Sequence, residues 1–153
     1  MFKITLKGLI GKRFVLRRVR RTRVVRRVNR RGSNAQYLKY KEQARTLVEN
    51  RISEFNKFYN YKINRIAIRN QRTRWGSCSK SGNLNFNYKL ALIPESLADY
   101  VIVHEICHLG EFNHSKNFWS LVEKTIPDYI KRREDLRKIN SEYFKQFTGQ
   151  ALD

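Results

Sequence analysis

The chain has few of the features that mark secreted or membrane proteins. Its 153 residues include only two cysteines, Cys78 and Cys107, too few for the disulfide framework of a small secreted domain. No run approaches the roughly 20 apolar residues that a membrane-spanning helix needs. The N-terminus lacks the apolar core and the cleavage site of a secretory signal peptide. We therefore expect a cytoplasmic protein that does not contact a membrane.

Acidic residues are also scarce, and residues 1–33 contain none. The chain has 33 Lys and Arg against 13 Asp and Glu, for a formal net charge of +20, and 13 of these basic residues lie in residues 1–33. Arginine interleaved with valine in this segment predicts either a strand pair or a disordered arm. The charge predicts nucleic-acid contact through residues 12–31, although a solubilising tail explains it equally well.

The remaining residues, 34–153, have the patterns of a single α+β domain. Helical periodicity predicts four helices, over residues 36–59, 94–110, 115–126 and 128–147. Strand alternation predicts a small antiparallel sheet built from residues 66–68, 73–78 and 83–88. We expect the strand over residues 84–88 to be half-buried and able to pair with an extended peptide.

All three histidines lie within the stretch VIVHEICHLGEFNH. His104 and His108 are four residues apart, so on a helix their imidazoles project from one face. Glu105 completes the pattern H-E-x-x-H, in which two histidines bind zinc and the glutamate is the general base. Gly110 ends the predicted helix and allows His114 to return as a third ligand. Three protein nitrogens leave the fourth position open for water, as in a catalytic zinc site.

The third ligand has one competitor, Glu123, which lies in the following predicted helix. We favour His114, because its place six residues after His108 otherwise has no explanation. The chain is not a metzincin, since Met1 is its only methionine and the Met-turn of that class is therefore absent.

An open zinc site beside a carboxylate predicts a zinc metalloendopeptidase of the H-E-x-x-H type. The cofactor is Zn²⁺, which activates water, and Glu105 takes a proton from that water and passes it to the leaving amine. The expected partner is a protein or peptide substrate, and we expect a monomer. The alternative is a nucleic-acid-binding protein, or a protease recruited to nucleic acid. A purely structural zinc site is less favoured, because it needs no base such as Glu105.

Three motifs between about Ile66 and Tyr129 resemble the YgjP-like metallopeptidase family, which contains small bacterial zincins related to the SprT and WLM groups. The motifs are R-W-G-S-C, H-E-x-C-H-L and N-H-S-x-x-F-W. The resemblance implies a minimal zincin fold over residues 34–153, with zinc on His104, His108 and His114 and with Glu105 catalytic. By analogy with the SprT group, it also makes a nucleic-acid-recruited protease attractive.

The sequence also predicts the roles of several residues around the H-E-x-x-H motif. We expect Trp75 to lie in the core rather than to line the cleft, and Phe118 and Trp119 to pack the helix that braces His114. Cys78 and Cys107 are expected to be small buried residues. A donor that stabilises the oxyanion is required, and the candidates are Tyr88, Tyr100, Tyr129 and Arg74.

Overall fold

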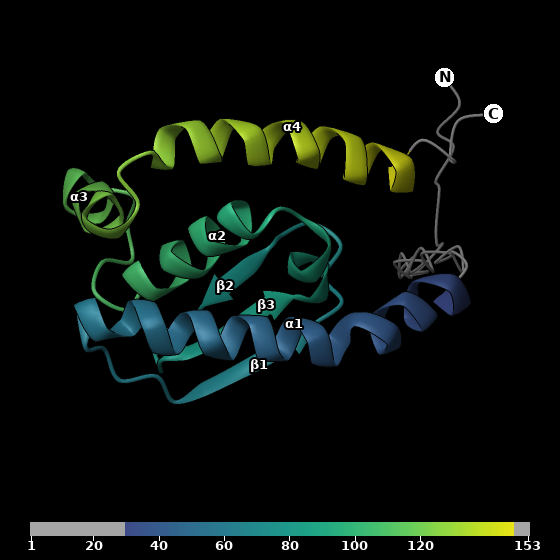
Figure 1. The fold of residues 1–153 in the computed structure, drawn as a ribbon, viewed down its shortest axis with the longest axis horizontal. Helices are drawn as coiled ribbons and strands as arrows, with labels where there is room; N and C mark the ends of the chain where they lie inside the picture. The colour runs from purple at the N-terminus through teal and green to yellow at the C-terminus, as the bar shows by residue number, and fades with distance from the viewer. Residues whose placement is uncertain (1–29, 149–153) are drawn as a thin grey trace, which may run out of the picture.

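The structure, a computed structural model, describes residues 30–148, and their side chains from 35 to 139 (Figure 1). The strand pair or arm predicted within residues 1–33 lies almost wholly outside the described residues and stays a prediction. No helix among the described residues is both long and apolar enough to cross a membrane.

The described residues form an α+β fold, as predicted. The elements in chain order are α1 (Arg30–Tyr59), β1 (Arg65–Arg69), β2 (Gly76–Cys78), β3 (Asn83–Asn87), the 3₁₀ helix η1 (Tyr88–Leu92), α2 (Glu95–Cys107), α3 (Lys116–Thr125) and α4 (Tyr129–Thr148). Helix α1 begins earlier than predicted, so that Gly32 and Ser33 fall in its first turn. They are tolerated there because the first N–H groups of a helix have no intrahelical partner.

The sheet is mixed, so the predicted antiparallel sheet is wrong for one of its strands. The order is β1-β3-β2, with β2 antiparallel to β3 but β1 parallel to it. Alternation along a strand shows which side chains share a face, but it does not show which strands are neighbours or in which direction they run. Strand β3 occupies the centre and both of its edges are paired, so the predicted pairing of this strand with a peptide is also wrong. Strand β2 has one edge unpaired within the described residues.

Strand β3 ends at Asn87, one residue before the predicted end. The Asn87 side chain accepts a hydrogen bond from the Lys89 N–H and donates to the carbonyl oxygens of Gln71 and Arg74. Tyr88, predicted to lie on the strand, therefore starts the 3₁₀ helix. The buried Asn87 side-chain amide therefore also links the loop between β1 and β2 to the end of β3.

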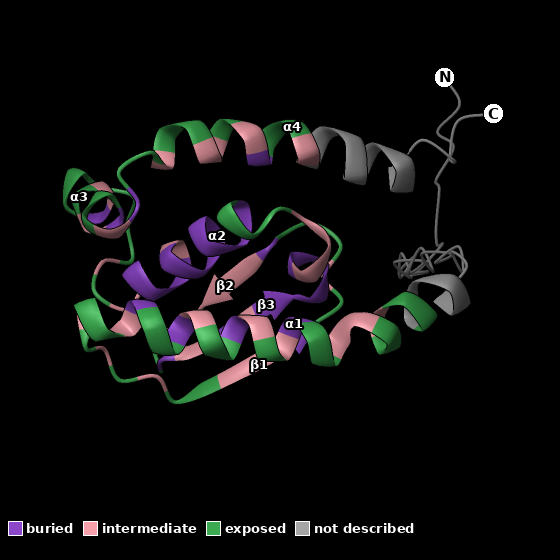
Figure 2. Ribbon diagram, viewed as in Figure 1, coloured by how far each residue is buried: buried purple, intermediate pink, exposed green. Residues whose placement is uncertain are grey.

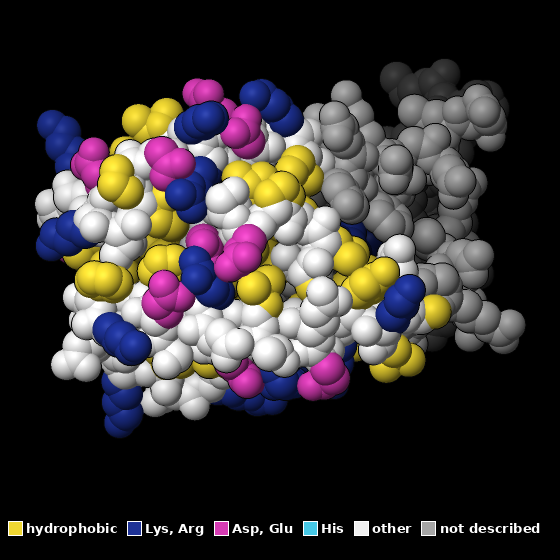
Figure 3. All heavy atoms as spheres, viewed as in Figure 1, with side chains coloured by type: hydrophobic (Ala, Val, Ile, Leu, Met, Phe, Trp, Pro, Cys, Tyr) yellow, Lys and Arg dark blue, Asp and Glu magenta, His cyan; other side chains and the backbone are white. Residues whose placement is uncertain are grey.

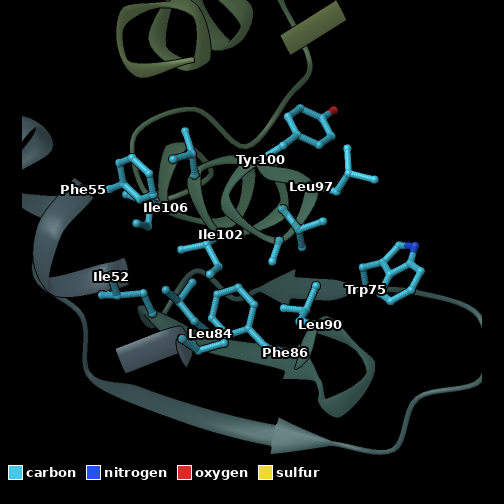
Figure 4. Packing of buried hydrophobic residues seen from close by; sticks show 14 of the residues in the cluster. Ile52, Phe55, Trp75, Leu84, Phe86, Leu90, Leu97, Tyr100, Ile102 and Ile106 are labelled. Atoms are coloured by element: carbon cyan, nitrogen blue, oxygen red, sulfur yellow. The ribbon is translucent and has the colours of Figure 1, made fainter. Parts of the chain in front are cut away.

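The core lies between one face of the sheet and the helices α1 and α2. Side chains of β3 and α2 meet there and α1 closes the side, as Figure 4 shows for Leu84, Phe86, Ile102, Ile106, Ile52 and Phe55. Trp75 belongs to the same core, as predicted, and is 6% exposed. Helix α2 is buried along most of its length (Figure 2), as expected for a helix that is apolar on nearly all sides. Apolar packing therefore holds the histidine-bearing helix against the sheet.

A partly buried ion pair fixes α2 against α1. The Arg51 guanidinium donates from Nε and from one terminal nitrogen to the two carboxylate oxygens of Asp99, which is 6% exposed. The Asp99 carboxylate raises the pKa of Arg51, and burial opposes this rise. Because a two-point contact of this kind is geometrically specific, it limits rotation of α2 about its axis.

Candidate metal centre

Helix α2 and the loop that follows it bring the three histidines together. The Nε2 atoms of His104 and His114 are 3.1 Å apart, and one ring nitrogen from each of His104, His108 and His114 lies within 4.8 Å of the others. The part of the chain that the structure describes contains no other such group, and Glu123 does not belong to it. His114 is exposed while the other two are half-buried, so the group opens to solvent at His114. No histidine is visible on the face shown in Figure 3, where Lys, Arg, Asp and Glu are interspersed.

These ring nitrogens suit a metal ion. Burial lowers the pKa of His104 to about 3, with smaller contributions from His108, His114 and Arg133, and burial also lowers the pKa of His108. Neutral imidazoles offer the lone pairs that Zn²⁺ binds at about 2.0–2.1 Å. A tetrahedral ion holds such nitrogens about 3.3 Å apart, close to the separation already seen between His104 and His114.

The backbone assists this arrangement at His108. Its Nδ1 lies 3.1 Å from the carbonyl oxygen of Glu111. A carbonyl only accepts, so Nδ1 carries the hydrogen and Nε2 keeps a free lone pair, the usual arrangement behind a metal-ligating histidine. His104 lacks such support, since its Nδ1 is buried with no hydrogen-bond partner among the described side chains and backbone.

Aromatic side chains form a wall behind the three imidazoles. Phe118 is fully buried, and its ring centroid lies 4.9, 4.6 and 4.8 Å from those of His104, His108 and His114. Trp119 stacks on His114 at 5.6 Å. These contacts confirm the packing role predicted for Phe118 and Trp119. Helix α3 is in turn started by Ser115, whose side chain accepts from the Phe118 N–H.

Helix α4 supports this wall from the other side. Tyr129 stacks on Trp119 at 5.2 Å, and the Arg133 guanidinium lies 4.8 Å from the centre of the Trp119 ring. The sequence patterns did not predict this contact of Arg133 with Trp119. The only available signal was its position four residues after Tyr129, which places both side chains on one helix face.

The side chain of Glu105 projects from α2 and packs against strand β2. Its side chain is 6% exposed, and a Cβ atom on Gly76 would lie 2.6 Å from its Cγ and Oε1 atoms. Burial raises the pKa of Glu105 to about 8, and the nearby Arg74 cation acts in the opposite direction. The role of Gly76 was not predicted, although a glycine inside a strand often marks a close approach of this kind.

The turn between α2 and His114 depends on a second glycine. Helix α2 ends at Cys107, and Gly110 lies in the turn that follows rather than at the helix end. A Cβ atom on Gly110 would overlap the hydroxyl group of Tyr61. The Glu111 N–H donates to the Cys107 carbonyl at 2.9 Å, which closes the turn and directs the chain back toward α2.

The structure narrows the candidates for the oxyanion donor. Tyr88 is excluded, because it is 1% exposed and its hydroxyl group donates to Gln36. Tyr100 remains, with its ring 5.9 Å from that of His104. Tyr129 also remains a candidate, because it stacks on Trp119. Arg74 remains because its charge acts on Glu105.

The cysteines lie outside the metal group. Cys107 is buried and Cys78 is half-buried, and both are free. Burial raises the pKa of each thiol to about 11. This agrees with the prediction of Cys107 as a buried residue rather than a ligand or nucleophile. Cys78 is less buried than predicted, although it packs against the core.

Comparison with known proteins gives a family and a fold. A family model described as YgjP-like, metallopeptidase domain, matches residues 13–139. The metallopeptidase zymogen of Pyrococcus abyssi abylysin is similar in structure, with a TM-score of 0.54 and 23% identity over 60% of this chain and 92% of that one. The metallopeptidase zymogen of Methanocaldococcus jannaschii jannalysin has a TM-score of 0.48 and 22% identity over 64% and 95%. The likeness to abylysin concerns the fold alone. No curated protein matches the chain.

Proposed function

Because the chain belongs to the YgjP-like metallopeptidase family, we propose that it hydrolyses peptide bonds with one zinc ion held by His104, His108 and His114. The family makes the chain a metallopeptidase; the ligand set and the steps below are our proposal. The observation that carries it is the convergence of three ring nitrogens, from the end of α2 and the loop after it, beside the helix that bears the buried Glu105.

Zinc, when bound, supplies a Lewis acid that acidifies water and polarises a carbonyl. Glu105 accepts a proton from the attacking water on its carboxylate as the water oxygen bonds to the carbonyl carbon. It then donates this proton to the nitrogen of the leaving amine as the C–N bond breaks. Strand β2 packs closely against the Glu105 side chain, so its carboxyl group is held in one place for both proton transfers. The oxyanion donor comes from Tyr100, Tyr129 or Arg74.

Zinc content and proteolysis, measured together, test the proposal. We expect about one zinc per chain and cleavage of an unfolded protein substrate. Glu105→Gln should keep the metal and lose cleavage. Glu111→Gln is the matched control: it removes a neighbouring carboxylate but leaves the backbone carbonyl that contacts His108, so it should keep both properties. Wild-type protein that fails to bind zinc stoichiometrically would contradict the proposal.

Nucleic-acid contact through residues 12–31 is a second proposal, supported by the 13 basic residues within residues 1–33. Binding of this kind releases counterions, so the logarithm of the affinity should fall linearly with the logarithm of the salt concentration. Replacing Arg17, Arg18, Arg20 and Arg21 with Gln should make that slope shallower. A slope that the substitutions leave unchanged would rule out this segment. A monomeric state and a cytoplasmic location likewise stay predictions.

A further inference from the structure

An open pocket of about 360 Å³ lies beside the C-terminal end of α2. Its walls come from three parts of the chain: residues 61–64 before β1, residues 80–82 between β2 and β3, and Leu109 and Phe112 after α2. None of the three histidines lines it. Its size is in the range of small ligand sites, and no part of the mechanism above uses it.

The pocket is connected to the metal centre through two of its walls. Leu109 directly follows His108, and the turn from residue 109 to 112 includes the Glu111 carbonyl that orients His108. The second wall continues from β2, which begins at Gly76 against Glu105 and ends at Cys78. A peptide extended along the unpaired edge of β2 advances about 3.3 Å per residue. Three residues of such a peptide therefore span β2 from Gly76 to Cys78, where the turn that carries Lys80 begins.

The chemistry of the lining favours an anion on an apolar stem. Lys62 and Lys80 are exposed and supply two ammonium groups, while Leu109, Phe112 and Tyr61 supply apolar surface. Phe112 is 44% exposed, so part of its ring is available to a ligand. No lining residue is acidic.

One carboxylate lies close to this surface. Glu111 acts electrostatically on Tyr61 but does not line the pocket. Two lysines against one flanking carboxylate still leave the pocket positive.

We propose that this pocket binds a glutamate or aspartate side chain of the peptide substrate and makes an acidic residue a determinant of the cleavage site. The two ammonium groups meet the carboxylate, and Leu109 and Phe112 contact its methylene groups. The proposal deepens the peptidase function and rests on it.

The first test maps cleavage sites in a mixed peptide library by mass spectrometry. Wild-type protein should show an acidic preference at one fixed position a few residues from the cut bond. The double substitution Lys62→Glu and Lys80→Glu should reduce that preference about tenfold, the size expected for losing charge-assisted contacts. Lys39→Glu is the control, since position 39 lies on α1 about 30 Å from the end of the helix at Tyr59, by a rise of 1.5 Å per residue. Absence of an acidic preference, or its persistence in the double variant, overturns the proposal.

The second test needs no turnover, so it separates failure of the pocket from failure of the peptidase. Binding of two short peptides that differ only by Glu or Gln is measured on full-length Glu105→Gln protein, with and without the two lysine substitutions. The Glu peptide should bind more tightly, and the advantage should disappear with the lysines but not with Lys39→Glu. Equal binding overturns the pocket assignment even if cleavage occurs. If a single-stranded oligonucleotide loses affinity on charge reversal while the peptides do not, the pocket serves nucleic acid and the proposal is likewise overturned.

Discussion

The carboxylate of Glu105 occupies the space that a side chain on Gly76 would need. A Cβ atom at position 76 would lie 2.6 Å from Cγ and Oε1 of Glu105 and 2.8 Å from Cδ, closer than real Cβ contacts. Strand β2 approaches α2 at this point because residue 76 has no side chain. The strand and the helix together therefore fix the position of Glu105 in the absence of substrate.

The first prediction is that Gly76→Ala displaces Glu105. Hydrolysis should fall by about 100-fold, the scale of loss expected when a catalytic group shifts by about an ångström. Zinc content should stay at the wild-type level, because the three atoms nearest to the added Cβ all belong to Glu105. Peptidase assays and metal analysis check both expectations. Ser77→Ala on the same strand is the control, and full activity in Gly76→Ala would contradict the assignment.

A second prediction concerns the third ligand. His114→Ala should lower zinc affinity by at least about tenfold, since it leaves two nitrogens where a catalytic site needs three protein ligands. Glu123→Ala should retain zinc, because the Glu123 carboxylate is exposed and outside the histidine group. Competition with a chromogenic chelator measures both affinities. The reverse pattern would make Glu123 the ligand.

The third prediction is that Glu105 destabilises the metal-free protein in a pH-dependent way. Its pKa is about 8 in the folded chain against a reference value of 4.5. The folded state therefore binds more protons than the unfolded state between these values, and stability falls as the pH rises through this window. Glu105→Gln should stabilise the metal-free protein by roughly 1–3 kcal/mol near pH 7 and by much less near pH 5.

Thermal unfolding at the two pH values checks this. The contributions of His104 and His108 have the opposite sign, since burial lowers the pKa of both side chains and stability therefore rises with pH up to about 6.5. These contributions are the same in wild-type protein and in Glu105→Gln, so they cancel in the stability difference between the two proteins. A stability difference that does not change with pH would show that Glu105 titrates normally.

A fourth prediction tests the aromatic wall. Trp119→Ala removes the ring that stacks on His114 and carries the contacts of Tyr129 and Arg133. Zinc affinity should fall by about tenfold, the lower end of the loss seen when groups that orient metal ligands are removed. Trp119→Phe keeps an aromatic face and should restore most of the affinity. Equal affinity in all three proteins would mean that His114 needs no such support.

The fifth prediction concerns Cys78. Burial raises the pKa of its thiol to about 11, and Glu105 adds to the rise. Because the thiolate is the reactive form, alkylation of the folded protein near pH 8 should be slower than that of the unfolded chain by roughly 100-fold. Mass spectrometry of peptides after timed iodoacetamide treatment measures this. Reaction at the unfolded rate would mean that the thiol is exposed and ionised.

Local patterns predicted much of the fold. The four-residue spacing of His104 and His108 placed both rings on one side of the last turn of α2 and its C-cap, and Ser115 marked the start of α3. Alternation identified Leu84 and Phe86 as buried on β3. These predictions succeeded because helix period, helix capping and strand alternation depend on residues close together in the chain.

Other features depended on tertiary contacts. Three such features are the parallel pairing of β1 with β3, the approach of His114 rather than Glu123 to His104 and His108, and the fit of Glu105 against Gly76. Each joins segments that are far apart in the sequence, so no helical or strand periodicity could predict it. The sequence patterns of these segments are compatible with several sheet orders and with either third ligand. Packing the apolar faces of β3, α1 and α2 into one core selected among them, because a close-packed interior tolerates few arrangements of the same side chains.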